Sequence, residues 1–214
     1  MITVYGRATS SNVQAVMWGI GELGLEYERL DYGHVYGGLD SSEFMEISPH
    51  ALVPAVRDGD LEMFESCAIL RYLGGRYGDA PFWPKDPACR ARVDIWAEWA
   101  KLNFCTDFTS RVFLPKIRTA AKDRDAAALA LGIANFETRL DRLEAQLEKH
   151  DYVASADFTL ADIVIGSVLF RWFDMDVARR PRPLVQAYYS RLKDRPAYRE
   201  HVMISYESLR ADGA

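Results

Sequence analysis

The chain has few of the residues on which metal centres and disulfide frameworks are built. Its four histidines stand singly, and its three cysteines, Cys67, Cys89 and Cys105, show no C-x-x-C spacing. This pattern predicts neither a tetrahedral metal site nor a paired disulfide framework. Unpaired cysteines without a recognisable leader sequence are typical of a reducing compartment, so we expect a cytoplasmic protein.

Positive charge and long apolar runs are also scarce. Lys and Arg number 26 against 31 Asp and Glu, for a net charge of -5, so no electrostatic footprint for nucleic acid is expected. The densest basic stretch, ARRPRP at 178–183, is interpreted as a solvated loop. No apolar run is long enough to cross a bilayer. Hydrophobic residues nevertheless make up 49% of the 214 residues, enough for a buried core in one domain or two small ones.

Strand and helix patterns alternate up to about residue 80. Three segments have the composition of strands: ITVY (2–5), YERLDY (27–32) and VPAVRDGDLEMF (53–64). The last is a hairpin, because Asp58-Gly59 is a strong turn signal. Three segments have helical spacing: 11–23, 41–48 with Ser41 or Ser42 as its cap, and 65–78. The order β-α-β-α-β-β-α combines a parallel unit with a terminal hairpin.

The rest of the chain is helical in pattern. Helices are predicted over 88–114, 125–149, 160–173, 184–193 and 197–210. The segment between the two halves is rich in proline and glycine, which makes it a natural linker. We therefore predict an α/β domain over residues 1–79, a linker over 80–88 and an all-helical domain over 89–214.

A proline opens the third strand, and an acidic residue followed by a hydroxyl opens the third helix. Because Pro54 cannot donate to a ladder, Val53-Pro54 is either an ordinary trans edge proline or a cis bond that turns the Val53 backbone outward. The free N–H groups at the helix start suit a carboxylate, to which Ser66 adds a hydroxyl, while Glu65 suits an ammonium group. Plain helix capping is the alternative for this pair.

Together these segments resemble the glutathione transferase family. SPHALVPAVRDGDLEMFESCAILRYL (48–73) is similar to the family's N-P-x-x-x-V-P-x-L…D-G…E-S-x-A-I-x-x-Y-L run, with Ser48 in place of the usual Asn. DFTLADIVIG (157–166) resembles the capping motif of the family's helical domain, with Thr159 and Asp162 at the S/T-x-x-D spacing. The resemblance covers nearly the whole chain. It implies the glutathione transferase fold, in which a thioredoxin-like N-terminal domain precedes an all-α domain.

The resemblance also implies where glutathione would lie. Val53 would pair through its backbone with the cysteinyl unit, and Pro54 would be cis. Glu65 and Ser66 would hold the amine and the carboxylate of the γ-glutamyl unit. The glycyl carboxylate usually meets a basic or amide side chain, and a surface role is the alternative for each local candidate. These candidates are His34 and His50.

The turn before the first helix is rich in polar residues: Thr9, Ser10, Ser11 and Asn12. One hydroxyl is enough to cap a helix, so the surplus needs another role. By resemblance to serine-type classes, Ser10, six residues before Val16, would donate a hydrogen bond to the glutathione sulfur. The S-x-N pattern is similar to the T-x-N of nu-like proteins, which makes Asn12 the second donor. Thr9 or Ser11 would then cap the helix, and Tyr5 is the rival donor.

Neutral donors at this turn are sufficient to stabilise a thiolate. Lowering the pKa of a free thiol by ~2 units from ~8.5 requires about 2.7 kcal/mol. A hydrogen bond to a charged acceptor contributes roughly 1.5–3 kcal/mol, and a helix N-terminus adds about 0.3–1. No His-Asp pair is evident that would make Ser10 a nucleophile, so we expect Ser10 to stabilise an anion.

The second substrate is expected between the domains, against the first half of the long helix. An aromatic wall with occasional polar groups suits a hydrophobic electrophile. The candidates for this wall are Tyr5, Asn103, Phe104, Asp107, Phe108 and Arg111. Trp172 and Phe173 are further candidates. Core packing plus a dimer seam is the alternative for each of these residues.

Three functions fit this reading. The first is detoxification by conjugation of glutathione, as co-substrate and without a metal, to a small hydrophobic electrophile. The second is glutathione-dependent reduction of a disulfide or peroxide on the same fold, which the nu-like pattern leaves open. The third is a non-catalytic scaffold, although a scaffold has no need of Ser10 or of Val53-Pro54.

Two further expectations follow from the resemblance. No cysteine lies in the first turn, which argues against the omega-like branch and its enzyme mixed disulfide, and Cys67 is expected to pack in the core. The resemblance also implies a homodimer, for which Gly74-Gly75 and the aromatic fourth helix offer a compatible face.

Overall fold

The predicted strands form one four-stranded mixed sheet. The computed structural model describes residues 1–211, and within it β1 (Ile2–Tyr5) pairs in parallel with β2 (Tyr27–Leu30). On its other side β1 pairs antiparallel with β3 (Ala55–Asp58), which pairs antiparallel with β4 (Leu61–Phe64). The sheet order is therefore β2-β1-β3-β4. The predicted strand 27–32 ends two residues early, at Leu30, and the strand predicted from Val53 begins at Ala55, whereas the first strand and the hairpin are confirmed.

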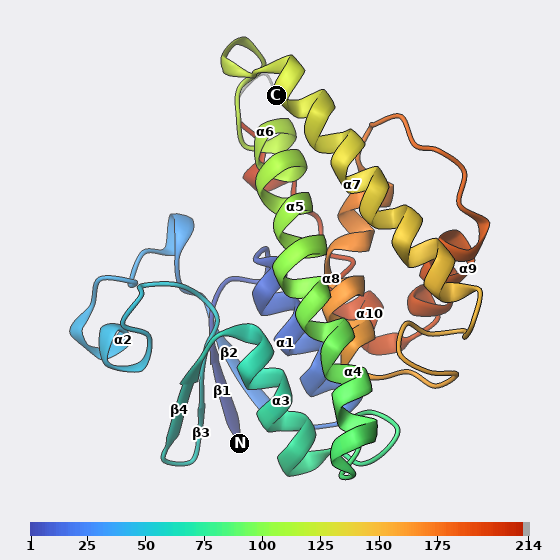
Figure 1. Cartoon of the computed structure of the whole chain (residues 1–214). Coiled ribbons are helices and arrows are strands. Elements are labelled where there is room, and N and C mark those ends of the chain that lie inside the picture. The colour runs from blue at the N-terminus through green and yellow to red at the C-terminus, as the bar shows by residue number, and fades with distance from the viewer. Residues whose placement is uncertain (212–214) are drawn as a thin grey trace.

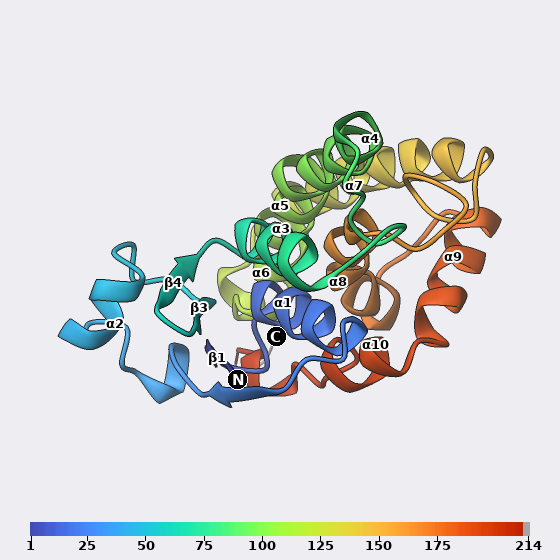
Figure 2. The same ribbon diagram turned by 90° about the horizontal axis from the view of Figure 1, so that it is seen from below.

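Helices cover both faces of this sheet (Figure 2). α1 (Ser11–Glu22) and α3 (Ser66–Tyr77) pack on one face, where side chains of β1 such as Val4 join theirs in an apolar core. α2 (Ser42–Ile47) lies on the other face, and its N-cap Ser41 accepts a hydrogen bond from the Phe44 N–H at 3.2 Å, as predicted. The element order confirms the thioredoxin-like fold expected from the sequence.

The second half of the chain is helical. After the linker come α4 (Pro87–Trp99), α5 (Thr106–Phe108), α6 (Leu114–Ile117), α7 (Ala126–Leu147), α8 (Leu160–Asp174), α9 (Pro183–Lys193) and α10 (Pro196–His201). Figure 1 shows that α4, α5 and α6 form one continuous rod that passes α1 and α3. The stretches between them, Ala100–Cys105 and Thr109–Phe113, are π-helical. Wide π turns of this kind are frequent at functional sites.

The last predicted helix is shorter than its periodicity suggests. Residues 197–210 were expected to form one helix, but α10 ends at His201 and a short 3₁₀ turn follows over Glu207–Leu209. The helix ends there because the apolar side chains that follow it, Tyr206 and Leu209, pack in the core. Tyr206 is buried and donates a hydrogen bond to Asp174 at 2.8 Å.

α8 is the central helix, and both halves of the protein pack against it. Nearly all its residues are buried, and it lies against α1 and α4. A Cβ at Gly166 of α8 would lie 2.7 Å from the Trp18 ring of α1, so glycine permits this close approach. An ion pair between Glu22 of α1 and Arg195, at 2.6 Å, joins the two halves at the surface.

The two glycines of α3 differ in their surroundings. Gly74 is buried, and a Cβ there would lie 2.9 Å from the Cβ of Trp83 in the linker, so it packs within the chain. Gly75 is exposed, and the expectation that it belongs to a dimer face stays a prediction. Within residues 1–211 no helix combines the length and the apolar character needed to cross a membrane.

Candidate active site

The candidate site begins at the N-terminus of α1, where Ser10 occupies the N-cap position. Its backbone is extended, yet its side chain makes no capping hydrogen bond, and the hydroxyl has no partner among the described residues. The turn is held by other groups: Gln14 donates to the Ala8 carbonyl at 2.9 Å, and Arg171 donates to the Thr9 carbonyl at 2.8 Å. The prediction that Thr9 or Ser11 caps the helix is therefore wrong, and the Ser10 hydroxyl is left free.

A cavity of about 90 Å³ opens beside this turn. It is lined by Asn12, Ser48, His50, Leu52, Val53, Pro54, Phe64, Glu65 and Ser66. Six of these residues were predicted for glutathione binding or catalysis from segments far apart in the sequence. His34 lies outside the cavity on an exposed loop, whereas His50 lies within it, with its ring edge-on to Phe64. Of the two histidine candidates, only His50 is placed to meet a ligand there.

The backbone of Val53 is open along this cavity. The Val53-Pro54 peptide bond is cis, as predicted. Strand β3 begins only at Ala55, and no backbone group among the described residues pairs with the N–H or C=O of Val53. An extended peptide can therefore add its own backbone hydrogen bonds at this edge.

Glu65 and Ser66 form the end of the cavity at the start of α3. Glu65 has φ of 68°, a left-handed conformation that costs a non-glycine residue about 1–3 kcal/mol. Strain of this kind is concentrated where a side chain has a specific task. Ser66 is 3% exposed and is the first residue of a twelve-residue helix, whose first N–H groups face an incoming anion. Glu65 thus offers a carboxylate to a cation, and Ser66 with the N-terminus of α3 offers a binding site to an anion.

A second cavity, of about 210 Å³, adjoins the first and lies between the domains. It is lined by Ser11, Asn12, Lys101, Cys105, Thr106, Thr109 and Ser110. Asn12 lines both cavities. The Lys101 ammonium group donates to the Asn12 side-chain oxygen at 2.9 Å and to the Ser66 hydroxyl at 3.1 Å. This lysine was missed from the sequence because it lies 89 residues from Asn12, and a single lysine in an aromatic stretch gives no signal.

The aromatic residues predicted for the second substrate lie on the wrong side of the rod. Phe104 and Phe108 are fully buried, and their rings pack against Phe136 of α7 at 4.7 and 5.2 Å. They belong to the core of the helical domain and cannot touch a ligand. The cavity is formed by the opposite side of the same rod, which carries Lys101 and Thr109. The core-packing alternative is therefore correct for the two phenylalanines.

The polar residues of that prediction also face away from the cleft. Asp107 pairs with Arg139 of α7 at 2.8 Å and with Arg111 at 3.3 Å. These contacts direct all three side chains toward the next helix. Asn103 is half-buried and lines neither cavity. The expectation that Asn103, Asp107 and Arg111 line the pocket is corrected: Asp107 joins the rod to α7, Arg111 pairs with Asp107, and Asn103 lines neither cavity.

Tyr5 is not placed to contact a sulfur atom at the α1 turn. Its ring lies on the α2 face of the sheet, 5.4 Å from the Tyr32 ring and 6.5 Å from that of Phe44. Burial raises the pKa of the Tyr5 hydroxyl above its usual value. The side chain next to it on β1, Val4, lies on the α1 face, because successive residues of a strand point to opposite faces. Tyr5 is thereby removed both as the rival donor and as a pocket residue.

None of the three cysteines has the character of a thiolate. Burial raises the pKa of Cys67, which lies in the core as predicted, and raises that of Cys105 to about 12. Cys105 donates its proton to the Val164 carbonyl at the edge of the second cavity. Cys89 is exposed, and its neighbour Asp86 raises its pKa. A reactive enzyme thiol is thus not part of this site.

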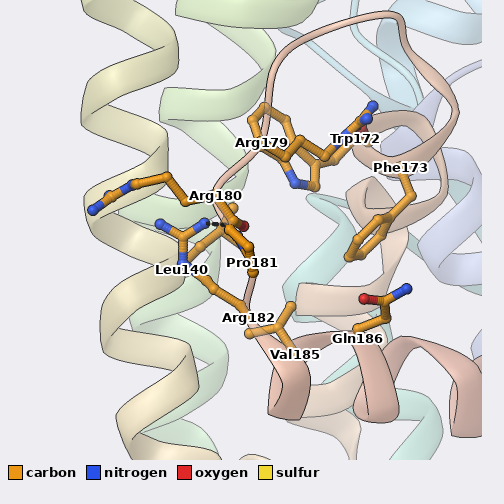
Figure 3. Close-up of a pocket in the computed structure, with 9 residues that line it drawn as sticks. All are labelled: Leu140, Trp172, Phe173, Arg179, Arg180, Pro181, Arg182, Val185 and Gln186. Carbon is orange, nitrogen blue, oxygen red and sulfur yellow. Dashed lines mark hydrogen bonds between the residues drawn. The ribbon is translucent and has the colours of Figure 1, made fainter.

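A third cavity, of about 330 Å³, lies far from the α1 turn, between α7, α8 and α9 (Figure 3). Trp172 and Phe173, predicted as further pocket candidates, form part of its wall instead of facing the cleft. Its arginines come from 178–183, the stretch interpreted as a solvated loop. Arg182 is only 8% exposed and binds Glu137 at 2.8 Å, so that interpretation is wrong for this residue. Arg180 also pairs with Glu137, whereas Arg179 donates to the Trp172 carbonyl.

The fold and the first cavity define a class of protein: a thioredoxin-like domain with an open backbone edge for a peptide, joined to a helical domain that closes the cleft. Residues 1–75 match the family model of the glutathione S-transferase N-terminal domain, and residues 126–201 that of the C-terminal domain. The chain belongs to the glutathione S-transferase family.

Individual relatives agree with this assignment over nearly the whole chain. The chain is 34% identical to glutathione S-transferase GstB of Escherichia coli, covering 95% of this chain and 99% of that protein. It is 29% identical to glutathione S-transferase 3 of Zea mays, covering 94% and 93%. A crystal structure of a theta class glutathione S-transferase from Xanthomonas axonopodis pv. citri, with glutathione bound, superposes with a TM-score of 0.91. The sequences of the two chains are 36% identical, and the superposition covers 95% of this chain and 98% of the Xanthomonas chain. The protein is an enzyme of the transferase class.

Proposed function

We propose that this protein joins the sulfur of glutathione to a carbon of a small, largely apolar electrophile. The observation that carries the proposal is the position of Asn12 and Ser10. Asn12 lines both cavities, and the free hydroxyl of Ser10 stands in the same turn. A peptide thiol bound in the first cavity would meet its donors where the second cavity begins.

Each end of glutathione has a partner in this proposal. The Val53 backbone pairs with the cysteinyl unit, Glu65 accepts from the γ-glutamyl ammonium group, and Ser66 with the N-terminus of α3 holds the γ-glutamyl carboxylate. His50, which lines the first cavity, is the basic residue that would bind the glycyl carboxylate. Lys101 adds a positive charge that lies within 3.1 Å of Ser66, and this charge favours both the carboxylate and the thiolate.

The chemistry needs no enzyme nucleophile. The thiol loses its proton to solvent, and the thiolate is stabilised by hydrogen bonds from Ser10 and Asn12. Its sulfur attacks the electrophilic carbon, a C–S bond forms, and the leaving group departs with the electron pair of the bond that breaks. Desolvation by the two domains strengthens each of these contacts.

Purified protein should be retained on immobilised glutathione and should conjugate an aryl halide. Turnover of the aryl halide is compared with turnover of a small disulfide and of a hydroperoxide, at the same glutathione concentration. Conjugation that exceeds both reductions is the expected result. Faster reduction of the disulfide or the hydroperoxide would make this a glutathione-dependent reductase, and failure to bind glutathione by calorimetry would leave a scaffold.

Replacing Glu65 with Gln should raise the KM for glutathione about 10-fold or more while kcat at saturation stays within twofold. The γ-glutamyl ammonium group loses a charged partner that contributes roughly 1.5–3 kcal/mol to binding, and the reacting sulfur is not touched. Steady-state kinetics at a fixed concentration of the aryl halide, with glutathione varied, gives KM and kcat separately. Glu62→Gln is the matched control, since Glu62 is an exposed glutamate that pairs with Arg57 on the hairpin. An equal fall in kcat for Glu65→Gln would contradict the assignment.

The assembly and the compartment are also part of the proposal. A homodimer is supported by apolar side chains left exposed on the rod, Ile95 at 65% and Leu102 at 67%. Light scattering should therefore give twice the mass of one chain, and the mass of a single chain would refute the dimer. Three free cysteines fit a cytoplasmic enzyme. The division into a sheet domain over 1–79, a linker over 80–88 and a helical domain over 89–214 is part of the proposal too, with α4 beginning at Pro87, two residues before the proposed linker ends.

A further inference from the structure

Positively charged side chains surround the β1–α1 turn, and no carboxylate of residues 1–211 forms an ion pair with them. Arg171 of α8 is the most deeply placed, at 3% exposed. Its guanidinium group donates to the Thr9 carbonyl at 2.8 Å and to the Gln14 side chain at 3.3 Å, and it lies 4.5 Å from the Phe113 ring centre. Its Nε has no hydrogen-bond partner in the described part of the chain. Burial lowers the pKa of Arg171 to about 10, so it stays charged at neutral pH.

Arg7 belongs to the same turn, since its carbonyl accepts a hydrogen bond from the Ser10 N–H at 3.1 Å. The side chain is half-buried, and its Nε is buried with no hydrogen-bond partner among the residues that the structure describes. Its guanidinium lies under the loop at Gly33, where a Cβ would be 3.2 Å from the Arg7 Nη1. Arg118, exposed just after α6, and His34 on that loop complete the cluster. Burial, followed by the positive charges of Arg118 and Arg7, lowers the pKa of His34.

Within residues 1–211, Arg7, Arg118 and Arg171 form no ion pair. Like charges held together at a partly buried site repel one another, and buried N–H groups without partners cost free energy. A protein retains such an arrangement where an anion completes it. In the pocket between α7, α8 and α9, by contrast, Arg180 and Arg182 are matched by carboxylates of the chain, and Arg179 donates to the carbonyls of Trp172 and Met175.

Contacts along the rod from α4 to α6, which Figure 1 shows as one continuous helix, give the side of the turn on which this cluster lies. Near its middle, Lys101 contacts Asn12 and Ser66, at the γ-glutamyl end of the proposed glutathione site. Twelve residues later the Phe113 ring lies against Arg171, which holds Thr9, and five residues beyond that comes Arg118. The cluster is therefore on the far side of Ser10 from Ser66. A second substrate that approaches the sulfur from that side meets it.

We propose that the electrophile carries a carboxylate, which Arg7 and Arg118 bind while its reactive carbon faces the glutathione sulfur. The inference rests on the proposed function and adds the charge of the second substrate. Arg118 is the more accessible of the two guanidinium groups, and Arg171 supplies positive potential from behind the turn. The reaction is unchanged: a C–S bond forms and the leaving group departs with its electrons.

A charge-matched pair of aryl halides tests this: 4-chloro-3-nitrobenzoate and 4-chloro-3-nitrobenzamide. The protein should show the higher kcat/KM for the benzoate, although the amide is the more reactive aryl halide. Arg118→Gln and Arg7→Gln should each lower kcat/KM for the benzoate about 10- to 100-fold, as expected for a lost charged hydrogen bond, and leave the benzamide within twofold. Arg111→Gln is the control, an exposed arginine of the same rod that pairs with Asp107.

Equal losses on both halides would overturn the inference and leave the proposed function standing. If Arg7→Gln instead raised the KM for glutathione with both halides, the inference would also be overturned, because the cluster would then hold the glycyl carboxylate. Calorimetry with the two thioether products gives a readout that is independent of turnover. The carboxylate product should bind more tightly than the carboxamide product, and Arg118→Gln should abolish the difference. If neither halide is conjugated and neither product binds, the proposed function falls as well.

Discussion

Ser10→Ala should raise the pKa of the thiol of bound glutathione by about 1–2 units and lower kcat/KM for conjugation about 10- to 100-fold. Both effects follow from the loss of one hydrogen bond to a charged acceptor, which contributes roughly 1.5–3 kcal/mol. The Ser10 hydroxyl makes no capping hydrogen bond with α1, so its removal should leave the free energy of unfolding within about 0.5 kcal/mol. The variant thus separates chemistry from folding.

Ultraviolet titration of the thiolate in the binary complex measures the pKa, and steady-state kinetics measures the rate. Thr9→Val is the matched control, because it removes the neighbouring hydroxyl from a residue whose carbonyl, and not its side chain, is used in the turn. A titration curve like that of the parent enzyme would refute the role of Ser10. If Asn12→Ala then shifted the curve, Asn12 would be the principal donor.

Asp162→Ala should lower the free energy of unfolding by about 3–5 kcal/mol. Asp162 is fully buried in α8, and its carboxylate accepts four hydrogen bonds. The donors are the Val153 N–H at 3.0 Å, the Thr159 N–H at 2.8 Å, the Thr159 hydroxyl at 2.9 Å and the Tyr188 hydroxyl at 2.9 Å. Alanine leaves these donors buried, and each unsatisfied group costs roughly 1–3 kcal/mol, with some recovery as the loop relaxes.

Denaturation by urea, followed by fluorescence, gives this free energy. Asp157→Ala is the control, since Asp157 is an exposed carboxylate of the same loop whose side chain makes no hydrogen bond with the described residues. We expect the control to stay within about 0.5 kcal/mol of the parent. A loss below about 1 kcal/mol for Asp162→Ala would mean that this network contributes little to stability.

The elements of the sheet domain could be predicted because each has a local cause. Asp58-Gly59 marks the hairpin, and Gly59 adopts φ of 60° in the turn that joins β3 and β4. Ser41 caps α2 through its own side chain. Hydrophobic spacing within a few residues is enough to define such elements. The error in the last helix, which ends at His201, arose where tertiary packing of Tyr206 overrides a continuous helical pattern.

The second cavity could not be predicted, because periodicity shows that a helix has an apolar face but not what that face meets. In the rod the aromatic face, with Phe104 and Phe108, packs into the core, and the polar face with Lys101 meets the sheet domain. The sequence predicts an aromatic wall because such a surface suits an apolar electrophile. Burial of a phenylalanine in the core is the stronger driving force, since it removes the whole ring from water.

By itself the sequence determined the fold, the family resemblance and the prediction that Val53, Glu65 and Ser66 face glutathione, since these depend on short motifs. The tertiary structure alone decided the electrostatics. Lys101 reaches Asn12 and Ser66 across the domain interface, and Arg171 reaches Thr9 over 162 residues. Coulomb interactions depend on distance in space and on burial, and neither is encoded by spacing along the chain.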